Sequence, residues 1–242
     1  MLCKTRLSKP FIRSYTGSNE FIKGIERYCI WIEDSELENA LTIPLIKERI
    51  EAVEEFRRNA GTRAQTAISR PHKFAWINKP KETQIIIPTV SSERREYIPM
   101  GFSDVSVIVS NSASIVHDPE PYVFALLQSK MHMVWVKAIA GKLEERIRYT
   151  SAICYNTFPV PKLMKAVIFK LTESALKILS VRESYSHLTL AELYDPDEMP
   201  SDLKQAHSEN DSLVEKLYKS SDFKTDEERL ERLFHYYEMM LN

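Results

Sequence analysis

Glycine and cysteine are scarce in this sequence, and each scarcity excludes a class of site. Only five glycines occur among the 242 residues, and they are scattered, so no cluster can bring backbone close to a bound phosphate. This excludes a P-loop and a Gly-x-Gly-x-x-Gly dinucleotide motif. The three cysteines are widely spaced and form no Cys-x-x-Cys pair. Their spacing argues against a disulfide framework and a zinc site, and it suits a reducing cytoplasm.

Long apolar runs and catalytic motifs are missing too. No stretch approaches the roughly 18 apolar residues of a membrane span, and the basic start, 1–10, has no apolar stretch behind it, so it is not a signal peptide. Enzymes that methylate exocyclic amines need an Asn/Asp-Pro-Pro-Tyr/Phe loop, and the nearest string, NTFP at 156–159, has Thr157 in place of the first proline. The six histidines show no metal-ligand spacing. We therefore predict no catalytic centre, metal or cofactor in this chain, and no membrane contact.

The net charge of −1 hides an uneven distribution of charge. Between Arg57 and Arg95, the basic segment, nine Lys/Arg stand against two acids, which gives a net charge of +7. From Glu183 to the end, the acidic tail, fifteen acids stand against six Lys/Arg, which gives a net charge of −9. A +7 stretch suits a polyanion such as DNA, although a solvated surface loop has the same composition. The acidic tail should face away from DNA or bind another protein surface.

The first 160 residues carry the patterns of a mixed structure. Alternating apolar and polar residues predict short strands at 27–33, 83–87, 97–100, 105–109 and 114–117. Apolar residues at helical spacing predict a helix over 44–59 and another over 122–140, which can break near Lys130. His132 in the second helix is interpreted as a packed, hydrogen-bonded residue rather than a ligand. A polar, basic loop is expected between the first helix and the strands.

After the proline-containing string at 159–161 the strand signals vanish. Helical patterns follow at 162–181, 201–219 and 226–241. Thr225 and Glu228 form a capping box at the start of the last of these helices. We therefore predict an α+β fold class, in which a mixed α/β domain with short strands, 1–160, is followed by an all-helical C-terminal extension, 161–242.

The string GKLEERIRY at 141–149 is the most informative local pattern. If it is extended, Glu144, Arg146 and Arg148 point to one face, about 7 Å apart at ~3.3 Å per residue, because strand side chains alternate. Such a face suits base edges, since arginine donates twice to guanine and a carboxylate accepts from the cytosine amine. A Glu beside an Arg could read both halves of one C·G pair. A surface salt-bridge ladder is the alternative that this string leaves open.

Five longer strings cover nearly the whole chain. They are FIRSYTGSNEFIKGIERYCIWIED (11–34), PLIKERIEAVEEFR (44–57), IPTVSSERREYIPMGF (87–102), SKMHMVWVKAIAGKLEERIRYTSAICYNTFPVP (129–161) and LAELYDPDEMPSDLKQAH (190–207). In this order they resemble the C-terminal portion of the MmeI-like type II restriction–modification enzymes, in which one polypeptide carries nuclease, adenine methyltransferase and target recognition domains. The family usually shows YNNFPWP where this chain has YNTFPVP, so Thr157 and Val160 depart mildly.

The resemblance implies a target recognition domain up to about residue 160 and a helical extension that helps clamp the DNA or packs back on that domain. In the family, alternate positions after a Gly-x-Leu choose bases, and they fall on Glu144, Arg146 and Arg148; an upstream position falls on Ser112. The family's methyltransferase needs S-adenosylmethionine and its nuclease needs a divalent metal. Both domains are expected outside this chain, as partners within the same polypeptide or complex, so neither cofactor is expected to bind here.

These patterns together predict a module that recognises a specific double-stranded DNA sequence for a restriction–modification adenine methyltransferase. Base reading is assigned to Glu144, Arg146, Arg148 and Ser112. Phosphate contacts, which set register without specifying sequence, are assigned to Arg57, Arg58, Arg63, Arg70, Lys73, Arg94 and Arg95. The alternative is a protein-interaction or scaffold module whose acidic helical tail docks a partner, and this alternative predicts no salt-dependent DNA binding.

Overall fold

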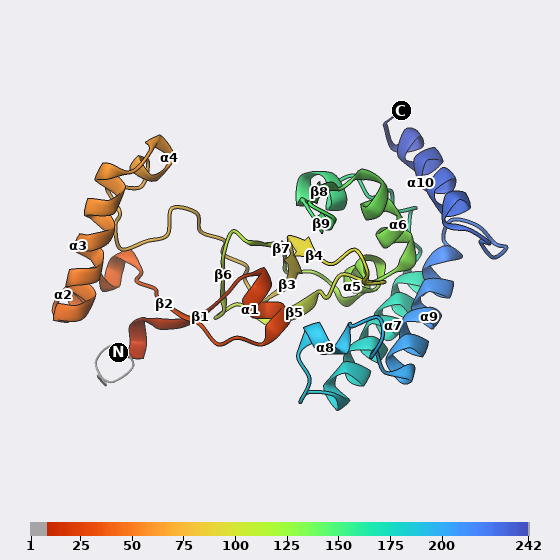
Figure 1. The fold of residues 1–242 in the computed structure, drawn as a ribbon, viewed down its shortest axis with the longest axis horizontal. Helices are drawn as coiled ribbons and strands as arrows, with labels where there is room; N and C mark the ends of the chain where they lie inside the picture. The colour runs from red at the N-terminus through yellow and green to blue at the C-terminus, as the bar shows by residue number, and fades with distance from the viewer. Residues whose placement is uncertain (1–8, 242) are drawn as a thin grey trace.

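The computed structural model describes residues 9–241, which form three regions along an elongated molecule (Figure 1). A small N-terminal lobe lies at one end, short strands lie in the middle, and helices cover the other end. Cys3 and the rest of the first eight residues, which belong to the start predicted not to be a signal peptide, lie outside the described residues. No helix within residues 9–241 is long and apolar enough to cross a membrane.

The N-terminal lobe is built on one long helix, α3 (Pro44–Asn59). Proline stands at its first position, where the missing N–H has no helical partner to lose, so the helix begins where the sequence predicts. The strand predicted at 27–33 is shorter, because Ile32 leaves it to enter a small core with Ile46 and Ile50 of α3. The other elements of residues 9–65, which include those that lead from the lobe to the middle strands, are η2 (Lys9–Phe11), β1 (Ile12–Thr16), α1 (Ser18–Lys23), β2 (Tyr28–Ile30), η3 (Asp34–Glu36), α2 (Leu37–Leu41) and α4 (Thr62–Gln65).

Short three-stranded sheets make up the middle of the described chain, in the orders β2-β1-β6, β5-β3-β7 and β4-β9-β8. Strand β3 is central and antiparallel to both β5 and β7. Its interior residues 85–87 are buried, as expected for a strand covered on both faces. The strands are β3 (Thr83–Pro88), β4 (Val90–Ser91), β5 (Gly101–Asp104), β6 (Ile108–Val109), β7 (Ala113–His117), β8 (Gly141–Leu143) and β9 (Arg146–Arg148).

The strand predicted at 97–100 is wrong, although its apolar residues are buried. The side-chain amide of Gln128 donates to the carbonyl of Ile98 (2.7 Å), and the guanidinium of Arg182 donates to the carbonyl of Met100 (2.8 Å). The backbone of this segment is therefore paired with side chains from helices rather than with a neighbouring strand. The predicted strand at 105–109 likewise shrinks to the two residues of β6.

The predicted break near Lys130 is confirmed, because α5 (Pro121–Leu127) and α6 (Lys130–Ile139) are separate helices. Ser129 caps the second one, and its hydroxyl accepts from the N–H of His132 (3.2 Å). A π-helical turn at Ser151–Tyr155 precedes the C-terminal helices. These are α7 (Lys165–Ser184), α8 (Leu190–Leu193), α9 (Ser201–Glu215) and α10 (Asp226–Leu241). The predicted fold class is confirmed: a mixed part with small sheets is followed by a helical region.

The mixed part and the helical region share one core. Trp135 of α6, Leu171 of α7 and Leu233 of α10 belong to the same cluster of buried side chains. Polar contacts cross the same boundary, since the side-chain amide of Asn210 on α9 donates to the carbonyls of Ala125 (2.8 Å) and Gln128 (3.2 Å). Helices α5 and α6 therefore pack against the C-terminal helices.

Asp211 of α9 is a half-buried carboxylate at this boundary. Its Oδ1 accepts from the backbone N–H of Lys130 (2.6 Å), and its Oδ2 accepts from the hydroxyl of Tyr97 (2.6 Å). Burial raises the pKa of Asp211 to about 6, although both hydrogen bonds act in the opposite direction. The folded protein thus holds the carboxyl proton of Asp211 more tightly than the unfolded chain does. The ionised carboxylate therefore lowers the stability of the fold at neutral pH.

We expect Asp211→Asn to stabilise the fold relative to the unaltered chain above pH 7, because the amide has the same shape and no charge. The stabilisation from the protonated carboxyl is complete below its unfolded pKa and is lost as the pH rises through about 6. The unfolding free energy of the unaltered chain, relative to the variant, should therefore fall by at most about 3 kcal/mol between about pH 4 and pH 7. Urea unfolding of both chains measures this difference, and a difference that does not vary with pH would contradict the assignment.

Candidate nucleic-acid interface

The string 141–149 is not extended throughout: it forms a β-hairpin, so the one-face geometry that full extension would give is corrected. Strands β8 and β9 pair antiparallel around a two-residue turn made by Glu144 and Glu145. Glu144 has a positive φ of 58°, the backbone conformation required at the first turn position of a type II′ hairpin. Neither turn residue is a glycine or an asparagine, so the sequence carried no turn signal at this point.

Strand β9 is the central strand of its sheet and is held on both sides. It pairs with β8 and also with β4, where Val90 lies opposite Arg148. Alternation turns Ile147 inward, where it is 6% exposed, and turns Arg146 and Arg148 outward. Arg146 and Arg148, two of the four predicted base-reading residues, therefore share one exposed face, and Glu144 lies at the tip of the hairpin.

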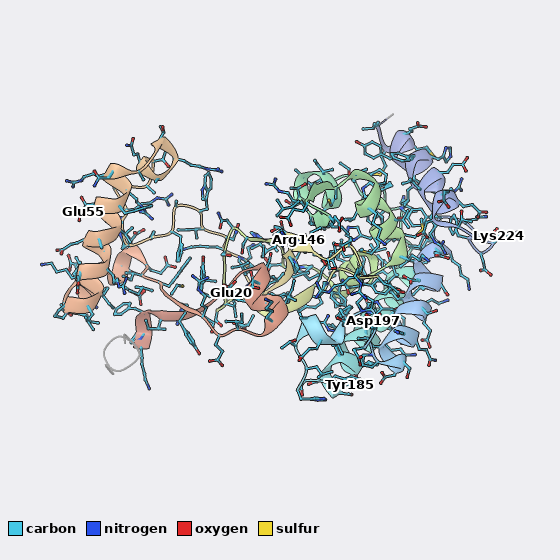
Figure 2. All side chains as sticks on the ribbon, viewed as in Figure 1. Glu20, Glu55, Arg146, Tyr185, Asp197 and Lys224 are labelled. Carbon is cyan, nitrogen blue, oxygen red and sulfur yellow. The ribbon has the colours of Figure 1, made fainter. Side chains whose placement is uncertain are left out.

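Glu144 and Arg146 form an ion pair at this tip, with 2.7 Å between Oε2 and Nη2. Both side chains are accessible, since Arg146 is 48% and Glu144 is 77% exposed. Figure 2 places Arg146 in the central region of the molecule, away from the C-terminal helices. An exposed pair of this kind stabilises a fold by only about 0–1 kcal/mol, so exchanging the partners for base edges costs little. The salt bridge that the string left open is thus present, and it is compatible with base reading.

Ser112 is exposed and lies between β6 and β7 in the chain, but its polar atoms are engaged within the protein. Its Oγ accepts from the backbone N–H of Ser18 at the start of α1 (3.2 Å) and lies 2.7 Å from the Oγ of Ser110. Its carbonyl accepts from the hydroxyl of Thr89, which directly precedes β4. A Cβ on Gly17 would overlap both serine hydroxyls, so this close approach requires glycine. A base contact by Ser112 stays a prediction.

Two exposed residues, Asn111 and Trp76, were not predicted as site residues from the sequence. Asn111 lies next to Ser112, and Trp76 of the basic segment is 69% exposed, with the guanidinium of Arg63 5.5 Å from its ring centre. Asn111 and Trp76 both line one cavity of about 200 Å³, together with Tyr15. Asparagine is an ordinary turn residue and tryptophan is ordinarily a core residue, so neither type marks a site by itself.

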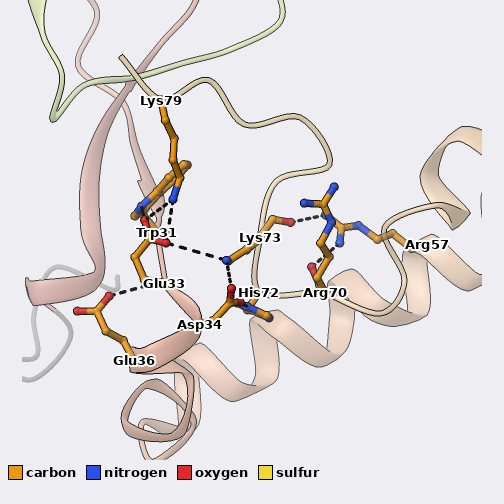
Figure 3. Close-up of polar contacts among 9 residues, drawn as sticks. All are labelled: Trp31, Glu33, Asp34, Glu36, Arg57, Arg70, His72, Lys73 and Lys79. Carbon is orange, nitrogen blue, oxygen red and sulfur yellow. Dashed lines mark hydrogen bonds and ion pairs between the residues drawn. The ribbon is translucent and has the colours of Figure 1, made fainter. Parts of the chain in front are cut away.

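Arg57, one of the predicted phosphate contacts, is turned into the protein (Figure 3). Its side chain donates from Nη1 to the carbonyls of Ala67 (2.7 Å) and Arg70 (2.9 Å), and from Nη2 to the carbonyl of Lys73 (2.7 Å). The residue is only 8% exposed. Because these carbonyls belong to the loop after α4, Arg57 fixes that loop against α3 and has little surface left for a phosphate.

Acidic residues before α2 neutralise much of the same loop (Figure 3). Asp34 pairs with Lys73 and with His72 (2.8 Å), and Glu33 pairs with Lys79 (3.1 Å). The hydrogen bonds from Lys79 to Glu33 and from Lys73 to Asp34 hold the pKa of each carboxyl below its usual value, so both acids stay ionised. The side chain of Lys73 is 14% exposed. The count of +7 therefore overstates the charge that this loop presents to a ligand.

Three arginines of the N-terminal lobe remain on the surface. Arg58 pairs with Glu54 one turn earlier on α3, yet its side chain is 67% exposed. Arg70 is exposed, and one Nη2–H donates to a backbone carbonyl of the same loop, whereas Arg63 lies over Trp76. In Figure 1, α4 and the hairpin lie on the same side of the molecule, with β6 between them. Arg58, Arg63 and Arg70 are thus exposed cations of the N-terminal lobe.

The other predicted phosphate contacts lie close to the acidic tail. Arg94 forms an exposed ion pair with Asp197 (2.6 Å), and this pair raises the pKa of Arg94. Arg95 is half-buried, and its Nε has no hydrogen-bond partner among the described residues. Both cations are therefore placed where the tail competes with phosphate.

His132 of α6 and Thr157 have structural contacts. His132 is fully buried, with Nδ1 2.9 Å from the carbonyl of Leu127, and burial lowers its pKa to about 4, as expected for the packed residue predicted from the sequence. Thr157 of the NTFP string accepts from the indole N–H of Trp135 (3.1 Å). Within residues 9–241, His, Cys, Asp and Glu form no group of three that could hold a metal ion.

Comparison with known proteins gives a consistent family. The model described as "MmeI, target recognition domain" matches residues 1–162, and that described as "MmeI, C-terminal domain" matches residues 164–242. DNA methyltransferase A of Bacillus subtilis (strain 168) is 41% identical over 232 residues, which are 96% of this chain and 26% of that protein. The structure of the type IIL restriction–modification enzyme MmeI in complex with DNA matches 99% of this chain and 32% of its own, with a TM-score of 0.94 and 35% identity. The chain thus spans about a quarter to a third of the length of these relatives.

We expect Arg57→Ala to destabilise the N-terminal lobe by about 2–4 kcal/mol, because it removes three charged hydrogen bonds and leaves their carbonyls without donors. The neighbouring variant Arg58→Ala should change stability by less than about 1 kcal/mol, since only an exposed ion pair is lost. Urea unfolding followed by tryptophan fluorescence compares the two. If both variants are equally stable and Arg57→Ala binds DNA more weakly, Arg57 contacts phosphate rather than stabilising the loop.

Proposed function

The chain belongs to the MmeI-type restriction–modification family, as its target recognition and C-terminal domains, and from this premise we propose that it recognises a specific double-stranded DNA sequence. The observation that carries the proposal is the exposed Glu144–Arg146 pair on a hairpin held on both sides by backbone pairing and packing. The solved MmeI enzyme was in complex with DNA, which supports the same class of partner for this chain.

Base reading by the hairpin follows from the chemistry of its side chains. Arg146 would donate to O6 and N7 of a guanine, and Glu144 would accept from the amine of the paired cytosine. Arg148 would address a neighbouring base pair, since it projects from the same face of β9. Each well-formed pair would supply about 1–3 kcal/mol of discrimination. Ser112 would add a contact through its hydroxyl.

Phosphate contacts would come from the N-terminal lobe. Arg58, Arg63 and Arg70 are exposed there, and such contacts set the register of the protein on the duplex without specifying sequence. Three other predicted contacts are less suited to this role. Arg94 and Lys73 already pair with acidic residues, and Arg95 is half-buried. With the hairpin and α4 on one side of the molecule, a duplex lying across this side would meet both sets of arginines (Figure 1).

Catalysis would be performed by methyltransferase and nuclease domains of the same polypeptide or complex. Recognition would place one adenine at that methyltransferase, which must take the base out of the stack to reach its amine. S-adenosylmethionine would be the cofactor of the methyltransferase, and a divalent metal that of the nuclease. Both cofactors are assigned to those other domains.

Selection from a pool of random DNA duplexes, with sequencing of the bound fraction at two salt concentrations, tests the function. Enrichment of a short motif that contains a C·G pair would support sequence recognition. Binding without enrichment would mean that the chain contacts the DNA phosphate backbone without reading its sequence. An absence of binding even at low salt would overturn the proposal and favour a protein-interaction module that docks through the acidic tail.

We expect Arg146→Ala to weaken binding to the enriched motif by about 10-fold and to leave binding to random DNA almost unchanged, because one bidentate base contact is lost. The double variant Glu144→Ala/Arg146→Ala should lose the preference for the C·G pair. Competition binding with matched and random duplexes measures the ratio. Equal losses on both duplexes would show that Arg146 contacts only phosphate.

We expect Arg63→Ala to do the reverse, lowering affinity for every duplex and reducing the slope of log affinity against log salt by about 1. Lys204→Ala, which removes an exposed cation from α9, serves as the control and should leave the slope unchanged. Titrations over a range of salt concentrations give both slopes. An unaltered slope in Arg63→Ala removes this residue from the footprint.

A further inference from the structure

The hairpin is joined to the protein core without a flexible linker. Helix α6 ends at Ile139, and β8 begins at Gly141, so a single residue, Ala140, separates them. The N–H of Ala140 still donates to the carbonyl of Val136 (2.8 Å), which continues the helical bonding up to the hairpin. A tilt or shift of α6 is therefore transmitted directly to β8.

The other end of the hairpin is also seated on α6. Tyr149 follows β9 and is 1% exposed, and its hydroxyl lies 3.3 Å from Nε2 of His132. The two rings also meet edge to face, with 5.8 Å between their centres. The backbone N–H of Tyr149 donates to the carbonyl of Thr89 (2.8 Å). Helix α6 thus controls both the entry and the exit of the hairpin.

The C-terminal helices hold α6 at two places. At its start, Asp211 of α9 accepts from the N–H of Lys130, as described above. Along its length, the ring of Trp135 packs against Phe234 and Tyr237 of α10, with ring centres 5.3 and 5.5 Å apart. These contacts come from the acidic tail, a part of the chain whose charge would repel DNA.

We propose that helices α9 and α10 position the hairpin through α6 and thereby set its discrimination between DNA sequences, with Asp211 as the positioning residue at the start of α6. The proposal rests on the proposed function, because it presumes that the hairpin reads bases. It gives the acidic tail a role in specificity that needs no contact with DNA.

Asp211 is well placed for this role by elementary helix physics. The first N–H groups of a helix have no partners within it, so acceptors from outside the helix must satisfy them. At the start of α6, the side chain of Ser129 accepts from the N–H of His132, and Asp211 accepts from the N–H of Lys130. The second carboxylate oxygen accepts from Tyr97, so one side chain ties α9, the segment before β5 and the start of α6 together.

Hydrogen exchange of the 242-residue chain without DNA tests the mechanical part of the proposal. Asp211→Ala removes the acceptor, Asp211→Asn keeps an oxygen for the N–H of Lys130, and Asp222→Ala removes an exposed acid of the same region as a control. We expect faster exchange over residues 139–149 in Asp211→Ala, restoration by Asp211→Asn and no change in the control. Unchanged exchange of the hairpin in Asp211→Ala overturns the proposal, whatever DNA binding shows.

DNA discrimination tests the functional part, with the motif enriched from the random duplex pool as the ligand. We expect the ratio of motif to random affinity to fall roughly 5- to 20-fold in Asp211→Ala, with the salt slope unchanged and with recovery in Asp211→Asn. Phe234→Ala, which loosens the same helix from α10, should lower the ratio in the same direction. A purely structural defect would lower both affinities together, and that outcome, or an unchanged ratio, overturns the proposal. Should the unaltered chain enrich no motif, the proposed function fails, while hydrogen exchange still decides the positioning of the hairpin.

Discussion

The position of helix α6 between the sheets and the C-terminal helices is the constraint on which the candidate interface depends. Its side chains from Met131 to Val136 are all buried, so the helix has no freedom to move without disturbing the shared core. Its start is tied to Asp211, and its end continues almost without interruption into the hairpin. A hairpin of two three-residue strands would be marginal alone, and here its order comes from α6 and from pairing with β4.

Burial and available partners, rather than residue type, decide what each arginine does. Arg57 points inward and serves three carbonyls, so it stabilises a loop. Arg58, the next residue on α3, lies on a different face of the helix and is exposed. Arg146 lies on an exposed tip and pairs with an exposed carboxylate, which leaves its donors exchangeable. A guanidinium group thus stabilises a loop at Arg57 and is a candidate for contacts with base edges at Arg146.

The sequence predicted the elements whose periodicity is strong and local. Helix α3 and the division of 122–140 into α5 and α6 follow from proline, serine and apolar spacing, and the structure has them. The hairpin at 141–149 was missed because Glu144 adopts a left-handed conformation that its residue type does not announce. The strand expected at 97–100 failed for a different reason, since Gln128 and Arg182 take its carbonyls from far along the chain.

The sequence by itself determined the composition of the candidate interface: a Glu and two Arg near one turn, a basic segment and the absence of glycine loops for cofactors. It also determined the fold class and the family, because apolar periodicity and long strings are properties of the chain read in order. Only the tertiary structure decided that Arg57 is buried, that Ser112 is bonded to Ser18, and that the acidic tail supports α6. These facts depend on contacts between residues far apart in the chain, and such contacts form only once burial and hydrogen bonding are satisfied together.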